Sequence, residues 1–146
     1  MKRSLVISAA VILVLVDRLI KIIALKGLLT ESFWFLGYPR FTLHKNFGLA
    51  FDLPLARGII IVLSLVFIMF LVFLLLRDLK KDKTCFSGLV FMIAGALANL
   101  IDRVQYGFVV DMIEVFPGSI WNIADVMILL GIALIILQKP ARVTAN

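Results

Sequence analysis

The sequence predicts an all-α polytopic membrane protein with four transmembrane helices, because apolar residues dominate its composition and gather in long runs. Hydrophobic residues make up 63% of the 146 residues and the mean hydropathy is +1.13, which is too apolar for a soluble chain of this length. The runs predict helices at about residues 4–25, 58–76, 85–102 and 122–138, separated on one side by loops 27–57 and 103–121. We expect a single membrane-embedded domain over residues 1–146.

The first predicted helix differs from the other three because it includes Asp17 and Lys21. It begins as a secretory signal does, with Lys2 and Arg3 before an apolar stretch. That stretch runs into charged residues without the small-residue cleavage site that a signal peptide needs. We therefore interpret it as a permanent transmembrane helix.

The positive charges predict how the four helices are oriented. Lysine and arginine cluster at one end of each predicted helix, at Lys2, Arg3, Arg77, Lys80, Lys81, Lys83, Lys139 and Arg142. The positive-inside rule places this end in the cytoplasm, so both termini should be cytoplasmic and both long loops should face outward. The formal net charge of +6 then reflects topology and gives no reason to expect a nucleic-acid partner.

Three aspartates lie near the outward end of different predicted helices. Counted from the cytoplasmic cations at about 1.5 Å per residue, Asp17 and Asp125 lie about 21 Å and Asp102 about 28 Å across a layer roughly 30 Å thick. Asn99 and Asn122 each precede one of them by three residues, a spacing that puts both side chains on one helix face. Carboxylates are costly inside a bilayer, so a layer of them predicts a site.

Structural interpretations compete with functional ones at several of these positions. Asp17 and Lys21 are four residues apart and are expected to form an ion pair rather than to act in catalysis. Asp102 with Arg103 is typical of a clamp at a helix end. Asp111 follows Gly107 and an apolar stretch, which indicates a chain that returns to the membrane surface beside Asp125. Glu114 is expected to be a solvated loop charge.

Two aspartates held together at a partly apolar site are suited to peptide hydrolysis. Close carboxylates share a proton, so the ionised member can activate water while the protonated member donates to the substrate carbonyl oxygen. The sequence has neither a G-x-S-x-G nor an H-E-x-x-H motif, and its single His44 and single Cys85 fall on opposite sides of the membrane. We expect no metal, no cofactor and no intramolecular disulfide.

Five short motifs, in order along nearly the whole chain, resemble those of the lipoprotein signal peptidases, also called signal peptidase II. They are Asp17-Arg-Leu-Ile-Lys21, Asn46-Phe-Gly-Leu-Ala-Phe51, Gly95-Ala-Leu-Ala-Asn-Leu-Ile-Asp-Arg103, Val109-Val-Asp-Met-Ile113 and Trp121-Asn-Ile-Ala-Asp125. The resemblance implies an enzyme of the bacterial cytoplasmic (inner) membrane whose active site faces outward. It would remove the signal peptide of diacylglyceryl-modified prolipoproteins by cutting just before the lipidated cysteine.

The resemblance also implies roles for particular residues. Asp111 and Asp125 correspond to the family's catalytic pair. Residues that would support the site or contact substrate are Asp17, Lys21, Asn46, Gly48, Asn99, Asp102, Arg103, Asn122 and Ala124. The implied partners are prolipoproteins and membrane lipids, with the enzyme itself a monomer.

The first outer loop has two interpretations. Its aromatic residues Phe33, Trp34, Phe35, Tyr38 and Phe41 are typical of a segment that lies at the membrane surface. The resemblance favours a small extracytoplasmic β element over the site.

Two functions of other classes compete with the peptidase. An ion- or proton-coupled transporter would place polar groups near the membrane midplane and would contain inverted repeats. This sequence shows neither feature. A non-catalytic assembly factor would use its acids only in structural pairs, yet there are more acids and asparagines in the outer layer than Lys21 and Arg103 could pair.

Overall fold

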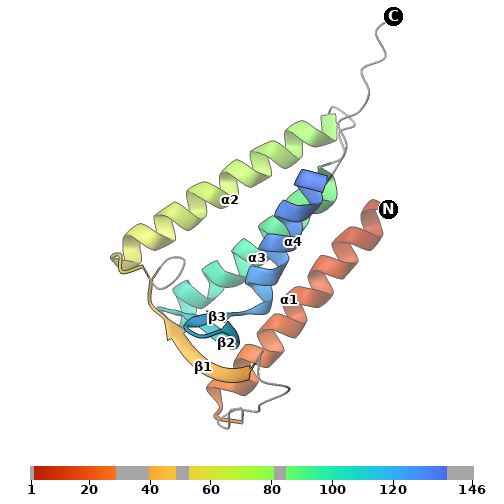
Figure 1. Ribbon diagram of the computed structural model, residues 1–146. Coiled ribbons are helices and arrows are strands. Elements are labelled where there is room, and N and C mark those ends of the chain that lie inside the picture. Colours follow the sequence, from red (N-terminus) through yellow and green to blue (C-terminus); the bar gives the residue numbers. More distant parts are fainter. Residues whose placement is uncertain (1, 29–39, 49–52, 81–84, 138–146) are drawn as a thin grey trace, which may run out of the picture.

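The computed structural model describes residues 2–28, 40–48, 53–80 and 85–137, which form four helices and one small sheet (Figure 1). The helices are α1 (Arg3–Leu25), α2 (Arg57–Lys80), α3 (Phe86–Gln105) and α4 (Ile123–Leu137). The strands are β1 (Arg40–Asn46), β2 (Val109–Phe116) and β3 (Ser119–Trp121). The sheet lies at the end of the bundle where α1 and α3 end and α2 and α4 begin.

All four predicted helices are present, although two are longer than expected. α2 continues from 76 to Lys80, and α3 continues from 102 to Gln105. Within the described residues, α2 and α3 are long and apolar enough to cross a membrane, and α4 is a shorter apolar helix of 15 residues. The predicted last residue of the fourth helix, Gln138, lies outside the described residues, as do the basic residues Lys81, Lys83, Lys139 and Arg142.

The helix α3 is the centre of the bundle and packs against each of the other three helices. Its seam with α4 depends on residues without large side chains. A Cβ added at Gly88 would lie 2.5 Å from the carbonyl oxygen of Gly131, and one added at Gly131 would lie 2.5 Å from that of Gly88. The two backbones therefore approach closely at the glycines, as small residues permit in membrane helix pairs.

The sheet joins the two long loops, which corrects the expectation that the β element belongs to the first loop alone. Its strand order is β1-β2-β3, with both pairs antiparallel. Only β1 comes from the loop predicted at 27–57, whereas β2 and β3 come from the loop predicted at 103–121. The hairpin between them contains Gly118 at φ +80°, a conformation that glycine adopts without strain. The aromatic residues predicted at 33–38 lie outside the described residues.

The strand β2 is buried on both of its faces, and the two faces contact different parts of the molecule. Val110 and Met112 pack against Ala24 at the end of α1. The alternate residues Val109 and Asp111 point to the opposite face, toward the other helices. This alternation directs the Asp111 side chain into the interior of the bundle.

The expectation for Glu114 is wrong. Its side chain is only 4% exposed, and Oε1 accepts a hydrogen bond of 3.2 Å from the backbone N–H of Gly118. The carboxylate stabilises the β2–β3 hairpin from within, so it is not a solvated loop charge.

Candidate active site

Polar residues of α2, α3, α4 and the sheet line a cavity of about 690 Å³. Its polar side is formed by His44, Asn46, Asn99, Arg103, Asp111 and Asp125. Apolar residues such as Phe67 of α2 and Ile128 and Leu129 of α4 complete the wall. The cavity is therefore a mainly apolar chamber with two acids in its wall.

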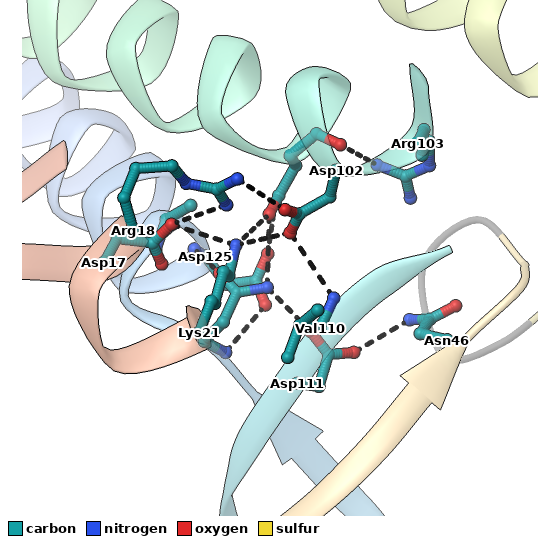
Figure 2. Close-up of polar contacts among 12 residues, drawn as sticks. Asp17, Arg18, Lys21, Asn46, Asp102, Arg103, Val110, Asp111 and Asp125 are labelled. Carbon is teal, nitrogen blue, oxygen red and sulfur yellow. Dashed lines mark hydrogen bonds and ion pairs between the residues drawn. The ribbon is translucent and has the colours of Figure 1, made fainter. Parts of the chain in front are cut away.

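A cluster of four charged residues, none of which lines the cavity, links α1 to α3 (Figure 2). Lys21 Nζ lies 2.9 Å from Asp17 Oδ2 and 2.8 Å from Asp102 Oδ2. Arg18 lies 3.1 Å from Asp17 Oδ2 and 2.6 Å from Asp102 Oδ1. Two carboxylates and two cations thus neutralise one another, and the predicted Asp17–Lys21 ion pair is confirmed. We call these four residues the ion-pair cluster.

The ion-pair cluster also holds the elements that present the acids. Asp17 Oδ1 accepts a hydrogen bond of 3.1 Å from the backbone N–H of Ala124, at the start of α4. Asp102 Oδ2 accepts one of 3.3 Å from the backbone N–H of Val110, next to Asp111 in β2. The cluster therefore fixes both segments that supply the dyad candidates, and Ala124 takes part through its backbone.

The expected clamp between Asp102 and Arg103 is wrong. Asp102 pairs with the cations of α1, while the guanidinium of Arg103 donates to the backbone carbonyls of Asn99, at 3.4 Å, and Gly48, at 3.2 Å. The cause is the direction of α3, which points Asp102 toward α1 and leaves its neighbour beside the cavity. Arg103 therefore connects α3 to the chain after β1.

Asp111 occupies the middle of β2 and is held by two amide side chains. Its Oδ1 accepts a hydrogen bond of 2.6 Å from Asn122 Nδ2, and its Oδ2 accepts one of 3.0 Å from Asn46 Nδ2. The residue is only 2% exposed. Burial, with the nearby negative charge of Asp125, raises the pKa of Asp111 to about 6, although both hydrogen bonds favour the ionised form.

Asp125 lies in the first turn of α4, where it forms a reciprocal cap with Asn122. Asn122 Oδ1 accepts a hydrogen bond of 2.9 Å from the backbone N–H of Asp125, and Asp125 Oδ2 accepts one of 3.1 Å from the backbone N–H of Asn122. This is the arrangement of a capping box, with Asn and Asp in place of Ser and Glu. The predicted Asn-x-x-Asp spacing therefore begins the helix as well as placing a carboxylate at the cavity.

Asn99 and Asn122 join the ion-pair cluster to both acids. Asn99 Oδ1 accepts from Lys21 Nζ at 3.3 Å and from Asn122 Nδ2 at 3.1 Å, which leaves its own amide to donate to Asp125 Oδ1 at 2.8 Å. Because a cation and a second amide occupy the oxygen, the Asn99 side chain has one consistent orientation. The two asparagines are thus fixed donors.

Each of the four carboxyl oxygens of Asp111 and Asp125 accepts one N–H donor from the protein. A carboxylate has about four acceptor positions, so both groups can still bind a water molecule or a substrate atom. Two interacting carboxyls in the wall of a mainly apolar chamber can act as a general acid and a general base. Among the described residues, no three His, Cys, Asp or Glu side chains are grouped to hold a metal ion.

The structure brings together all the predicted site residues and adds two. Arg18 belongs to the ion-pair cluster, although residues adjacent in a helix do not share a face. His44 lines the cavity, although its predicted position across the membrane from Cys85 gave no reason to expect it at the site. Its signal was its position two residues before Asn46, because alternate residues of a strand face the same side.

Comparisons with known proteins show which sequences and structures this chain resembles. The family model described as signal peptidase (SPase) II matches residues 9–139. The chain is 34% identical over 134 residues to the lipoprotein signal peptidase of Halothermothrix orenii, covering 86% of this chain and 88% of that one. It is 35% identical over 147 residues to that of Ralstonia nicotianae, covering 94% and 84%. A solved structure of a bacterial membrane enzyme superposes with a TM-score of 0.79 at 29% identity, covering 97% of this chain and 95% of the other.

Proposed function

This chain belongs to the signal peptidase II family, and from that premise we propose that Asp111 and Asp125 are the catalytic dyad with which it cleaves prolipoproteins. Family membership makes the protein an aspartic-type endopeptidase of lipoprotein processing. The dyad assignment rests on one observation above all. Asn122 donates from its side chain to Asp111 and from its backbone to Asp125, so a single residue binds both carboxyls at one site.

The two acids would work with a water molecule and without a covalent intermediate. The ionised member takes a proton from the water as it attacks the scissile carbonyl, and the protonated member donates to the carbonyl oxygen. On collapse of the tetrahedral intermediate, the acid that took the water's proton passes it to the leaving amine, and the other acid takes a proton from a hydroxyl of the gem-diol. The dyad therefore again holds one shared proton. Because the acids titrate as a coupled pair, the proton belongs to the dyad and not to one named residue. The mechanism uses no metal and no cofactor.

The four helices are proposed to cross the bacterial cytoplasmic (inner) membrane with both termini in the cytoplasm. The sheet and the dyad lie at the end of the bundle opposite Lys2 and Arg3. Because the positive-inside rule places these two cations in the cytoplasm, this position supports an outward-facing site. α1 includes Asp17, Arg18 and Lys21, yet it can cross because Asp102 completes an internal, neutral cluster with them. α4 is short but entirely apolar after its first turn.

The substrate is proposed to be a diacylglyceryl-modified prolipoprotein that is cut before its lipidated cysteine. Such a substrate has its own apolar signal helix and two acyl chains, so it would approach sideways through the bilayer. The apolar wall of the cavity, with Phe67, Ile128 and Leu129, suits an apolar substrate segment beside the acids. The enzyme would act as a monomer and needs no nucleic-acid partner.

The test is cleavage of a diacylglyceryl-modified prolipoprotein by the purified protein in detergent, followed by gel shift. The lipidated substrate should be cut and its unlipidated form should not. Asp111→Asn and Asp125→Asn should each abolish cleavage while the protein is extracted at normal yield. Glu114→Gln is the matched control, because it neutralises another buried carboxylate of β2 yet keeps an acceptor for Gly118.

Each alternative predicts a different outcome. Cleavage that persists in Asp111→Asn would overturn the dyad assignment. A well-folded protein that cuts neither substrate would support the assembly-factor hypothesis, and uptake of a labelled ion in proteoliposomes would support the transporter hypothesis.

A further inference from the structure

The strand β3 borders the cavity in a different way from the other two strands. β3 and the turn before it line the cavity with four consecutive residues, 118–121. β1 and β2 line it only with alternate residues, which are His44, Asn46, Val109 and Asp111. Alternate residues of a strand belong to one face of a sheet, whereas consecutive residues belong to both faces. The cavity therefore lies against one face of β1 and β2 but reaches around the outer edge of β3.

This outer edge has the groups that a further strand needs. β3 lies at the side of the sheet next to β2, and within the described residues no other strand adjoins it. The indole Nε1 of Trp121 donates a hydrogen bond of 2.7 Å to Ser119 Oγ, so the ring lies along its own strand. An edge strand has N–H and C=O groups that can pair with an extended peptide. β3 therefore offers backbone hydrogen bonds inside a mainly apolar chamber.

The proposed dyad lies where this edge ends. Trp121 is opposite Ile113 of β2, and Asp111 lies two residues farther along β2 in the direction in which β3 runs. Asn122 directly follows β3 and donates to both acids. Successive residues of a strand are about 3.3 Å apart, so a peptide paired with residues 119–121 would place its next residues beside the dyad.

We propose that the outer edge of β3 binds the substrate segment just before the cut as a further β-strand. This inference rests on the proposed function. It assigns the backbone of residues 119–121 as the partner of the signal-peptide side of the scissile bond.

The surroundings explain why this side of the substrate needs a partner. Peptide bonds within an α-helix are enclosed by neighbouring turns, so the signal helix must unwind before the cut, and its peptide groups then lose their helical hydrogen bonds. Unpaired peptide groups are strongly unfavourable in apolar surroundings. The chain after the lipidated cysteine leads outward to water, which hydrates its peptide groups. The acyl chains have the apolar wall with Phe67, Ile128 and Leu129.

The first test uses synthetic diacylglyceryl-modified lipopeptides with one N-methylated peptide nitrogen each, which removes a backbone donor and keeps the side chain. The methyl group is moved through the second to fifth residues before the cut, and kcat/KM is measured with wild-type protein in detergent. Alternate N–H groups of a strand point to one edge, so kcat/KM should fall about ten- to a hundredfold at alternate positions and much less between them. Methylation of the second and third residues after the lipidated cysteine is the control and should leave kcat/KM unchanged.

The second test locates the partner strand by disulfide formation. Directly opposite residues of paired strands have Cβ atoms about 4.5–5.5 Å apart, close to the separation that a disulfide needs. In an Asp125→Asn background that prevents cleavage, Ile120→Cys should form a disulfide with a lipopeptide that has a free cysteine at the second, third or fourth residue before the cut. Phe67→Cys, in the α2 wall of the same cavity, is the matched control and should form none. The background protein, whose single Cys85 directly precedes α3, should also form none.

The outcomes separate this inference from the proposed function. Equal losses at every methylated position, no loss at any position, or a loss only after the lipidated cysteine would overturn the inference while the peptidase itself stands. A disulfide with Phe67→Cys and none with Ile120→Cys would do the same. If wild type does not cut the unmethylated lipopeptide, the proposed function fails and this inference fails with it.

Discussion

Replacing Lys21 by Met tests whether the ion-pair cluster holds the fold together. Lys21 is 1% exposed and lies within 3.0 Å of both Asp17 and Asp102, at 2.9 and 2.8 Å. Without it, Arg18 alone faces two buried carboxylates. Removing one partner of a buried ion pair costs about 3–5 kcal/mol because the other charge stays desolvated. We expect the free energy of unfolding to fall by about that amount.

The assay is equilibrium unfolding in mixed micelles, followed by far-ultraviolet circular dichroism. The matched control is Lys26→Met, which removes an exposed lysine just after the end of α1 and should change stability by less than about 0.5 kcal/mol. A second variant combines Lys21→Met with Asp17→Asn, which leaves one cation, Arg18, with one carboxylate, Asp102. Its loss should be smaller than the sum of the two single losses by about 1–3 kcal/mol.

Two results would refute this reasoning. If Lys21→Met unfolds with the same midpoint as Lys26→Met, the cluster contributes no stability. If the double variant is additive, the cost of Lys21→Met does not come from the carboxylates that it leaves behind.

Three further predictions concern the acids, the helix seam and the chemistry. Because burial and the negative charge of Asp125 raise the pKa of Asp111 to about 6, kcat/KM should fall as the pH rises above about 6, where the dyad loses its shared proton. Asn46→Ala removes a donor that favours the ionised form, so this fall should move to higher pH. Gly131→Ala should destabilise the protein by about 1–3 kcal/mol, since its Cβ would lie 2.5 Å from a backbone oxygen of α3, whereas Gly58→Ala in α2, with nothing within 4 Å, should be neutral in the same unfolding assay. Cleavage should continue at full rate in excess chelator, and a loss that zinc restores would contradict the metal-free mechanism.

The helices could be predicted from sequence because their signals are local. Runs of apolar residues located all four, and the Asn-x-x-Asp spacing placed pairs of polar groups on one face. The same spacing at the start of α4 is also a capping box. A search for functional residues overlooks the cap because one of its two side chains, Asp125, is also the catalytic candidate.

The features that were missed depend on contacts between distant segments. The sheet pairs residues 40–46 with residues 109–116, and nothing local in either segment specifies that register. Glu114 appeared solvated because its acceptor contact depends on the turn at Gly118. Arg18 was overlooked because its position on α1 does not place it on the same helix face as Lys21. Its long side chain nevertheless reaches Asp102, which lies on another helix, α3. His44 could be placed only once β1 was known to lie beside Asp111.

The division of the proposed dyad between β2 and α4 has a consequence for biogenesis. Asp111 precedes the last described helix and Asp125 lies within it, so translation supplies the second acid only after three helices and the hairpin have been made. The bridging residue, Asn122, is also the cap that starts that helix. A nascent or incompletely inserted chain would therefore have no paired acids. The protein should gain the capacity to cut peptides only when its final span enters the bilayer, which would protect neighbouring membrane proteins during its synthesis.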